Sequence, residues 1–167
     1  MSRKLKILAA AAGCMMAAGL TQPSASGASP FDHVVGGGQN SPNAPNPVAH
    51  FQINAKSGPN GENAQGKFSF KRTSDGPPTE QFTATITCLR VVGNRAAVVG
   101  LVDRTKDDPF PAGRYYLVRI QDMGQGNSSQ DEIQNGVYTG DPYNCPSPTF
   151  NSITPITSGN LNVFDAS

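Results

Sequence analysis

Apolar and polar residues alternate along much of the chain, most clearly between residues 82 and 102, F-T-A-T-I-T-C-L-R-V-V-G-N-R-A-A-V-V-G-L-V. Every second residue from Phe82 to Cys88 is apolar, the period expected when one face of a strand meets a core and the other meets water. Gly93-Asn94 then separates two apolar runs. Both residue types tolerate the positive φ of primed two-residue turns. The pattern therefore predicts a β-hairpin whose first strand carries Cys88 on its inward face.

The same period predicts further strands at 48–55, 67–72, 114–121 and 160–164. Residues 96–102 are almost wholly apolar, which is typical of a strand covered on both faces. Residues 133–138 are interpreted as a minimal ribbon that turns at Asn135-Gly136. No stretch keeps helical spacing over three turns, so the predicted class is all-β.

Consecutive antiparallel strands separated by turns favour a small antiparallel β-barrel in meander order, with about six to eight strands and the last strand paired with the first. A β-sandwich remains open as the alternative. An outer-membrane barrel is disfavoured, because Trp is absent and the strands show no outward apolar band with aromatic girdles.

Three cysteines occur in the chain, and Cys14 falls in an apolar N-terminal run. The other two, Cys88 and Cys145, are predicted to form a disulfide, since an exported chain meets an oxidising compartment. Two free thiols are the alternative. Residues 139–159 carry four prolines and no hydrophobic periodicity. An irregular segment of this length is normally disordered unless a contact or a covalent bond holds it in place. The disulfide is expected to pin it across the strand that contains Cys88.

Residues 1–28 have the form of a secretory signal peptide, with three basic residues, an apolar run from Ile7 to Leu20 and small residues near Gly27 and Ala28. The run is shorter than the roughly 20 residues that a membrane-spanning helix needs, and no second run follows, so no transmembrane segment is expected. A lipoprotein signal ending at Cys14 is a competing interpretation. The expected location is secreted or in the cell envelope.

Residues 29–47 are rich in Pro, Asn and Gly and are interpreted as a flexible leader, with Gly36 to Gly38 as linker and Val34-Val35 as a pair that could dock as a short edge strand. Residues 48–167 then form a single all-β domain. The formal net charge is +1, with Lys and Arg scattered in ones and twos. This distribution predicts neither nucleic acid nor an anionic membrane as a partner.

The sequence offers little material for catalysis. His33 and His50 are its only histidines, and His33 lies in the expected leader, so a catalytic triad or a histidine metal site has few residues to draw on. No nucleophile elbow, P-loop, zinc-protease or dinucleotide motif is present. We therefore predict no catalytic residues, no metal-ligand set and no cofactor.

Acidic loop residues are the remaining candidates for binding: Asp103, Asp122, Asn127 and Asp131. Calcium is a possible ligand because oxygen-rich loops with glycines bind it, although the EF-hand spacing fails where Gly124 and Gly126 replace ligand positions. If the loops meet at one end of the barrel, Asp103 and Asp122 would form a carboxylate pair suited to acid-base chemistry. Asn127 also begins a glycosylation sequon.

Four segments together resemble a group of uncharacterised exported bacterial proteins, mostly actinobacterial: V-V-G-G-G-Q, G-K-F-S-F, T-C-L-R-V-V-G-N-R-A-A-V-V-G and V-R-I-Q-D-M-G-Q-G-N-S-S-Q-D-E-I. The likeness spans about residues 34 to 134. The shared segments are turns and strands, so the resemblance implies an extracellular β-domain and supplies no activity or functional residues.

Three functions follow as hypotheses. The first is a non-enzymatic exported binding or structural protein that uses loops at one end of its scaffold to hold an extracellular protein or glycan. The second is a small barrel enzyme or carrier of an apolar ligand, with Asp103, Asp122 and His50 at the mouth of the cavity. The third is a secreted hydrolase inhibitor that presents the disulfide-pinned loop around Cys145.

Overall fold

The computed structural model describes residues 30–41, 48–73, 80–106, 112–124, 130–151 and 154–166. The expected signal peptide, residues 1–28, and the candidate Asn127 lie outside this part of the chain. Within it, no helix is long and apolar enough to cross a membrane.

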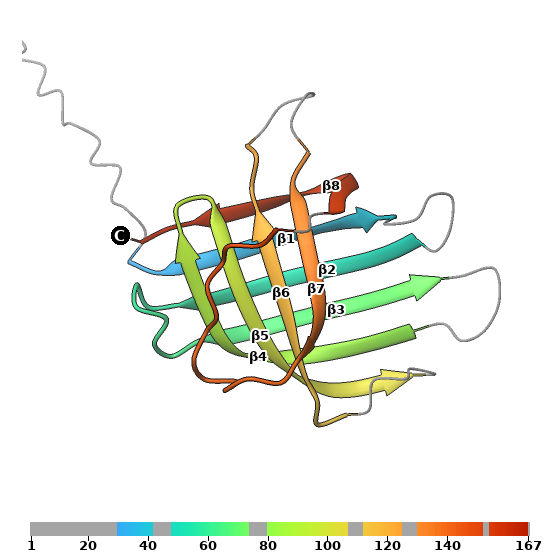
Figure 1. Ribbon diagram of the computed structural model, residues 1–167, viewed down its shortest axis with the longest axis horizontal. Helices are drawn as coiled ribbons and strands as arrows, with labels where there is room; N and C mark the ends of the chain where they lie inside the picture. Colours follow the sequence, from blue (N-terminus) through green and yellow to red (C-terminus); the bar gives the residue numbers. More distant parts are fainter. Residues whose placement is uncertain are drawn as a thin grey trace, which may run out of the picture.

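Eight antiparallel strands form a closed barrel in simple meander order, and β8 pairs with β1 to close it (Figure 1). The strands are β1 (Asp32–Asn40), β2 (Val48–Ser57), β3 (Gln65–Thr73), β4 (Glu80–Val92), β5 (Arg95–Lys106), β6 (Tyr115–Gln121), β7 (Glu132–Tyr138) and β8 (Thr154–Phe164). The predicted all-β meander barrel is confirmed, and the sandwich alternative is not adopted.

The barrel is flattened. Strands β1 to β4 lie side by side in one layer, while β6 and β7 cross over them in a second layer, and β5 bends from one layer into the other (Figure 1). Two irregularities in the β4–β5 ladder accompany this bend, one between Thr83 and Ala84 and one between Ile86 and Cys88. A β-bulge bends its strand and increases the local twist.

Aromatic side chains fill the middle of the barrel. Phe68, Phe70, Phe82 and Tyr116 are each 2–3% exposed, and their ring centroids lie between 4.7 and 6.4 Å apart. Aliphatic residues from seven strands, such as Val34 and Leu161, complete the core. Burying each large apolar side chain contributes about 1.5–3 kcal/mol, so this filled interior is the main source of stability.

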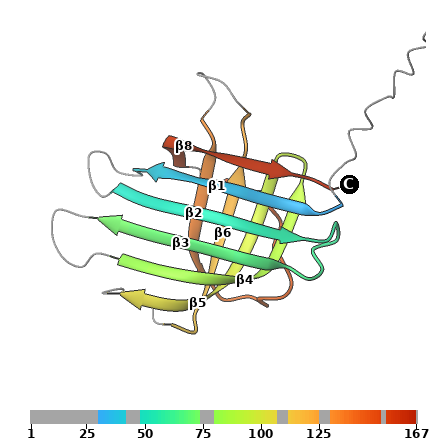
Figure 2. The same cartoon turned by 180° about the vertical axis from the view of Figure 1, so that it is seen from behind.

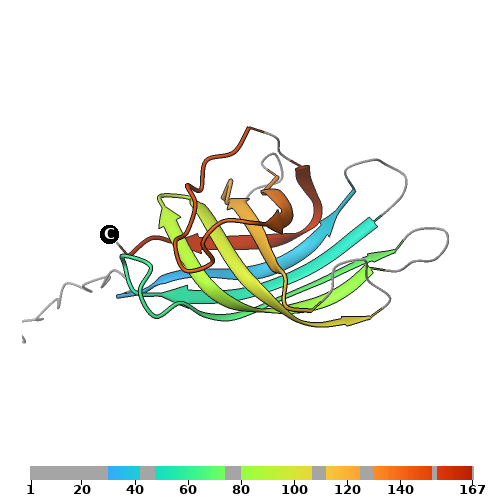
Figure 3. The ribbon, with the colours of Figure 1, turned by 60° about the horizontal axis from the view of Figure 1, so that its bottom comes forward.

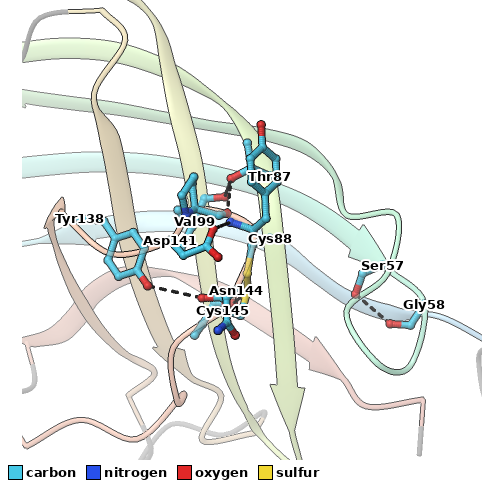
Figure 4. The surroundings of a disulfide bond; sticks show 12 residues. Ser57, Gly58, Thr87, Cys88, Val99, Tyr138, Asp141, Asn144 and Cys145 are labelled. Atoms are coloured by element: carbon cyan, nitrogen blue, oxygen red, sulfur yellow. Dashed lines mark hydrogen bonds between the residues drawn. A yellow bond between two sulfur atoms is a disulfide. The ribbon is translucent and has the colours of Figure 1, made fainter.

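The bulge between Ile86 and Cys88 corrects the predicted face of the cysteine. Ile86 pairs with Gly100 while Cys88 pairs with Val99, so Thr87 is the extra residue and Cys88 turns to the outside of the barrel. There Cys88 forms the predicted disulfide with Cys145, with the two Cα atoms 5.6 Å apart (Figure 4). The alternating pattern gave the wrong face because a bulge shifts the period by one residue.

The disulfide holds residues 139–151, which we call the strap, across the outside of β4, β5 and β6 (Figure 3). The Thr87 hydroxyl donates to the Pro142 carbonyl at 2.8 Å, and Arg119 donates through Nε to the Ser147 carbonyl at 3.0 Å. Outward residues Ala97 and Val99 of β5 are fully buried. The prediction that this strand is covered on both faces is confirmed.

The expected leader contains a barrel strand. Asp32–Asn40 is β1, paired along its length with β2 and β8, so the domain begins before residue 48. Its glycines suit close backbone approach rather than a linker. A Cβ added at Gly36, where φ is +141°, would lie 2.2 Å from the Asn160 carbonyl oxygen. The sequence pattern did not predict β1 because its glycines make it poor in apolar residues. The strand needs these glycines to fit between β2 and β8.

Two further boundaries differ from the prediction, while the central hairpin is confirmed. Asn135-Gly136 is no turn, because β7 pairs continuously with β6 from Tyr115–Tyr138 to Gln121–Glu132. Strand β8 begins at residue 154, inside the segment expected to be irregular. The Gly93-Asn94 hairpin forms with a positive φ of 59° at Gly93.

Candidate functional site

Two of the predicted acidic residues, Asp122 and Asp131, close a seam in the barrel. Strands β7 and β8 pair through only two residue pairs, which leaves the rest of that β8 edge without a ladder partner. The Asp131 carboxylate accepts from the backbone N–H of Leu161 at 2.7 Å, and the Asp122 carboxylate accepts from that of Val163 at 3.0 Å. Both side chains replace the missing strand, because buried backbone donors need acceptors.

The other oxygens of these carboxylates are also engaged. Asp131 accepts from the Met123 N–H at 3.0 Å, and Asp122 accepts from the Gly124 N–H at 2.7 Å. The described residues contain no group of three or more His, Cys, Asp or Glu side chains placed to hold a metal ion. Asp122 and Asp131 therefore act in the described structure as backbone acceptors that anchor β8.

Asp103 lies elsewhere, on the outer face of β5. Its carboxylate accepts from Lys67 at 2.7 Å and from the Thr85 hydroxyl at 2.6 Å. Desolvation raises the pKa of Asp103, but the hydrogen bonds from Lys67 and Thr85 and the positive charges nearby outweigh it and hold this pKa below its usual value. The Asp122 backbone carbonyl accepts from the Asn94 side-chain amide, which lies beside the opposite end of β5, so the structure does not bring Asp103 and Asp122 together as a pair.

The outer face of β1 to β5 gathers basic side chains that are scattered in the sequence. Strand register turns five of them outward from β2, β3 and β5: Lys56, Lys67, Lys71, Arg104 and Lys106. Among the described residues of these strands, Asp103 is the carboxylate that shares this face. We call this surface the cationic face. Figure 2 shows the strands that carry it, β1 to β5, from the side on which it lies.

Two shallow depressions of about 850 and 500 Å³ run along the cationic face. They share Gln52, Ser69 and Thr83, so they form one continuous surface over β1 to β4. Amide and hydroxyl side chains contribute to its lining, with Lys67 and Arg104 at one end and Lys71 in the other depression. Such groups both donate and accept hydrogen bonds, as polar ligands require.

Glycines keep the floor of this surface low. Gly37 and Gly38 of β1 and Gly159 of β8 line the smaller depression. A Cβ at Gly159 would lie 2.2 Å from the Gly37 carbonyl oxygen, and one at Gly38 would lie 2.4 Å from that of Ser158. The close approach of β1 and β8 therefore requires glycine and leaves no side chain to obstruct a bound molecule.

Aromatic side chains border the cationic face near the start of β1. His33 stacks on Phe164 with ring centroids 5.9 Å apart, and the His33 Nε2 atom lies 3.3 Å from Asn54 Oδ1. Phe164 is 47% exposed. His50 lies on the same face and lines the smaller depression. Both histidines belong to a polar surface, and His33 contacts Asn54 and Phe164 there.

The cationic face could have been found in the sequence from the parity of its positions. Lys67 and Lys71 are separated by an even number of residues, as are Arg104 and Lys106, so each pair shares a face. The parity of positions within one strand does not show how neighbouring strands align. The bulge beside Thr83 makes Asp103 the extra residue between Val102 and Arg104. The Asp103 carboxylate lies 2.7 Å from Lys67 Nζ, a contact that the alternation of residues does not predict.

Comparison of the chain with protein-family models, with curated proteins and with solved structures finds no match. The fold defines a class, the eight-stranded antiparallel meander barrel.

Proposed function

We propose that this protein is an exported, non-enzymatic binding protein that holds an acidic glycan on its cationic face. The observation that carries the proposal is the strand register, which places Lys67, Lys71 and Arg104 along one continuous depression and turns Lys56 and Lys106 to the same outer face. These cations attract the acidic groups of the chain, while the Gln, Asn, Ser and Thr side chains match its hydroxyls. The cationic face replaces the loop end as the proposed docking region.

The shape of the depression favours a polymer over a small molecule. It is open and crosses several strands, and neighbouring strands are about 4.8 Å apart, so the four strands from β2 to β5 span roughly 14 Å. A chain of sugar rings can lie along such a surface and contact several lysines at once. The exposed Phe164 ring at its border offers an apolar face to a sugar ring.

Export rests on the residues of the N-terminus and is supported by the disulfide. The sequence of residues 1–28 has the pattern of a signal peptide. A disulfide between Cys88 and Cys145 is compatible with an oxidising compartment. N-terminal sequencing of the protein recovered outside its producer tests this part, and a first residue near Ala28 or Ser29 is the expected result.

Calorimetric titration tests the ligand class. Carboxymethyl dextran and unmodified dextran share one backbone, so their comparison isolates the acidic groups. We expect binding of the carboxymethyl polymer that weakens with salt. The double variant Lys67→Gln/Lys71→Gln should lose it, whereas Arg90→Gln/Arg114→Gln, which removes the same number of charges at exposed positions that line neither depression, should retain it.

Two outcomes contradict the proposal. Equal loss in the control variant would show that net charge matters and the cationic face does not. Binding of single-stranded DNA as tight as that of the acidic glycan at the same salt concentration would show a nucleic-acid surface instead.

The strap supports a second candidate, the hydrolase inhibitor. Tyr143 is 76% exposed at the outside of the strap, two residues from Cys145. A disulfide that fixes an exposed aromatic residue reduces the entropy lost on binding a partner. Inhibition of an extracellular hydrolase that the Tyr143→Ala variant loses would support this candidate, and absence of inhibition across a hydrolase panel would reject it.

A further inference from the structure

A cavity of about 300 Å³ is lined by residues at the C-terminal ends of β1 and β3, at the N-terminal ends of β2 and β8, and in β7. We call it the corner cavity. Phe70 and Ile133 give it apolar walls, while Asn40 and Arg72 give it polar ones. Its volume is about ten times that of one water molecule in the liquid, so it has room for a small molecule of roughly ten non-hydrogen atoms.

The corner cavity collects polar atoms that have no hydrogen-bond partner. Three buried side-chain atoms in the described part of the chain are of this kind, Asn40 Oδ1, Ser41 Oγ and Arg72 Nε, and two of their side chains, Asn40 and Arg72, line the cavity. Asn40 is only 5% exposed. Folded proteins keep few buried polar atoms unpaired, because each costs free energy. Their concentration beside one cavity indicates a missing partner.

Strand register explains how the cavity is formed. Asn40 of β1 pairs with Ala49 of β2, which pairs with Arg72 of β3. The three side chains share the inner face. The backbones of β1 and β3, which lie on either side of β2, are about 9.6 Å apart. Because Ala49 has a small side chain, space remains above it between the Asn40 amide and the Arg72 guanidinium. A ligand seated over Ala49 would meet both groups.

The charges at this corner are balanced. Arg72 Nη1 lies 3.0 Å from Glu80 Oε2 in an ion pair, and the guanidinium also lies 5.6 Å from the centre of the Phe70 ring. A ligand carboxylate would be repelled by Glu80, and a ligand ammonium by Arg72. Among the side chains that line the cavity, which include Gln134, Asn135 and Thr154, the buried atoms without a hydrogen-bond partner are one acceptor, Asn40 Oδ1, and one donor, Arg72 Nε–H.

We propose that the corner cavity binds a small uncharged molecule with an apolar body and an amide group. The amide N–H donates to Asn40 Oδ1, its carbonyl accepts from Arg72 Nε, and the body packs on Phe70 and Ile133. This site lies on the inner face of the barrel and does not depend on the function proposed for the cationic face.

Nitrogen-15 NMR titration of the whole protein with three probes tests the proposal. The probes are δ-valerolactam, cyclohexanone, which has no N–H, and cyclohexanecarboxylate, which is charged. We expect saturable shifts of the amide signals around Asn40, Arg72 and Thr154 with the lactam. Affinity for the other two probes should be at least about tenfold weaker, since each leaves a buried group unpaired.

Two variants locate the site, and a third is the control. Ala49→Leu fills the cavity and Asn40→Leu removes the acceptor, so both should abolish the lactam shifts while keeping a folded spectrum. Asn160→Leu, at an exposed position of β8, should bind the lactam as the original protein does. Absence of saturable lactam shifts in the original protein, or their persistence in Ala49→Leu, overturns the proposal.

Stability gives a second measurement. Asn40 Oδ1 is buried without a hydrogen-bond partner in the free protein. A polar side chain that serves ligand binding in this way lowers the stability of the protein without its ligand. The Asn40→Leu variant should therefore unfold at a higher urea concentration than the original protein. A lower midpoint would show that Asn40 serves the fold and would overturn its assignment as a ligand acceptor.

Discussion

At the scale of the residue, short polar side chains and glycines stabilise the barrel in ways that the pattern of apolar residues does not predict. Asp122 and Asp131 satisfy backbone donors on an edge of β8, and Gly36 and Gly38 allow β1 to approach β8. From the sequence, these residues suggest loops, metal binding and a linker. The contacts that they make with β8, or that let β8 approach, join residues 30 or more positions apart, and a local pattern contains no information about such contacts.

Removal of the Asp131 side chain should destabilise the barrel. The variant Asp131→Ala leaves the Leu161 N–H buried without an acceptor and also loses the bond from Met123. Each unpaired buried donor costs about 1–3 kcal/mol, so we expect a loss of roughly 3 kcal/mol in the free energy of unfolding by urea. Asp141→Ala, at an exposed position in the strap, should lose much less. Equal losses in both variants would contradict the role of Asp131 in the seam.

Two glycine substitutions distinguish a required glycine from a tolerated one. Gly36→Ala places a Cβ 2.2 Å from a backbone oxygen at a positive φ, whereas Gly136→Ala meets nothing within 4 Å. We expect the first variant to lose several kcal/mol and the second to remain within about 1 kcal/mol of the original protein. Thermal unfolding measures both. A stable Gly36→Ala variant would show that β1 does not lie as close to β8 as described.

The pH dependence of stability should report on Asp103. Its pKa is lower in the folded protein than the ordinary 3.8 of the unfolded chain, so its charge stabilises the fold above that value and the effect is lost as pH falls through the folded pKa. The advantage of the original protein over Asp103→Asn should be below about 1 kcal/mol at pH 7 and should vanish in acid. Urea unfolding from about pH 2 to pH 7, a range that spans the ordinary pKa of an Asp side chain, checks this. A constant difference would exclude titration of Asp103 as its cause.

At the scale of the element, the hydrophobic period predicted most of the strands. The runs around Phe51, Phe68 and Phe82 lie in β2, β3 and β4, as the alternation indicated. The failures have separate physical causes. β1 carries three consecutive glycines, β8 begins beside a proline, and the bulge at Thr87 reverses the face of Cys88. In each case, contacts with other strands determine where the strand lies or which way its side chains face, and the sequence of the segment alone does not.

The disulfide and strap act together as one stabilising element. Cys88 and Cys145 are 57 residues apart, and closing a loop of that length is worth about 4 kcal/mol in the chain-entropy model. The double variant Cys88→Ala/Cys145→Ala should lose roughly that amount in urea unfolding and should expose Ala97 and Val99 to hydrogen exchange. Reductant should have a similar effect on the original protein and none on the variant. Unchanged exchange at β5 would contradict the covering role of the strap.

At the scale of the whole molecule, the barrel separates stability from recognition. Its interior is filled by aromatic and aliphatic side chains, while the five basic residues of the cationic face lie outside on β2, β3 and β5. A net charge of +1 gave no sign of a charged surface, because net charge does not describe how charges are distributed. The cationic face arises only when strand register brings Lys56, Lys67 and Arg104 to one side.

The measurement that tests this account most directly is nitrogen-15 NMR mapping of carboxymethyl dextran on the whole protein. We expect the perturbed amides to lie along the outer face of β1 to β5, around Gln52, Lys67 and Thr83, and to recover as salt is added. The strap and the outer side of β6 should remain unchanged. Absence of perturbation, or its concentration on the strap, would contradict the cationic face as the binding surface.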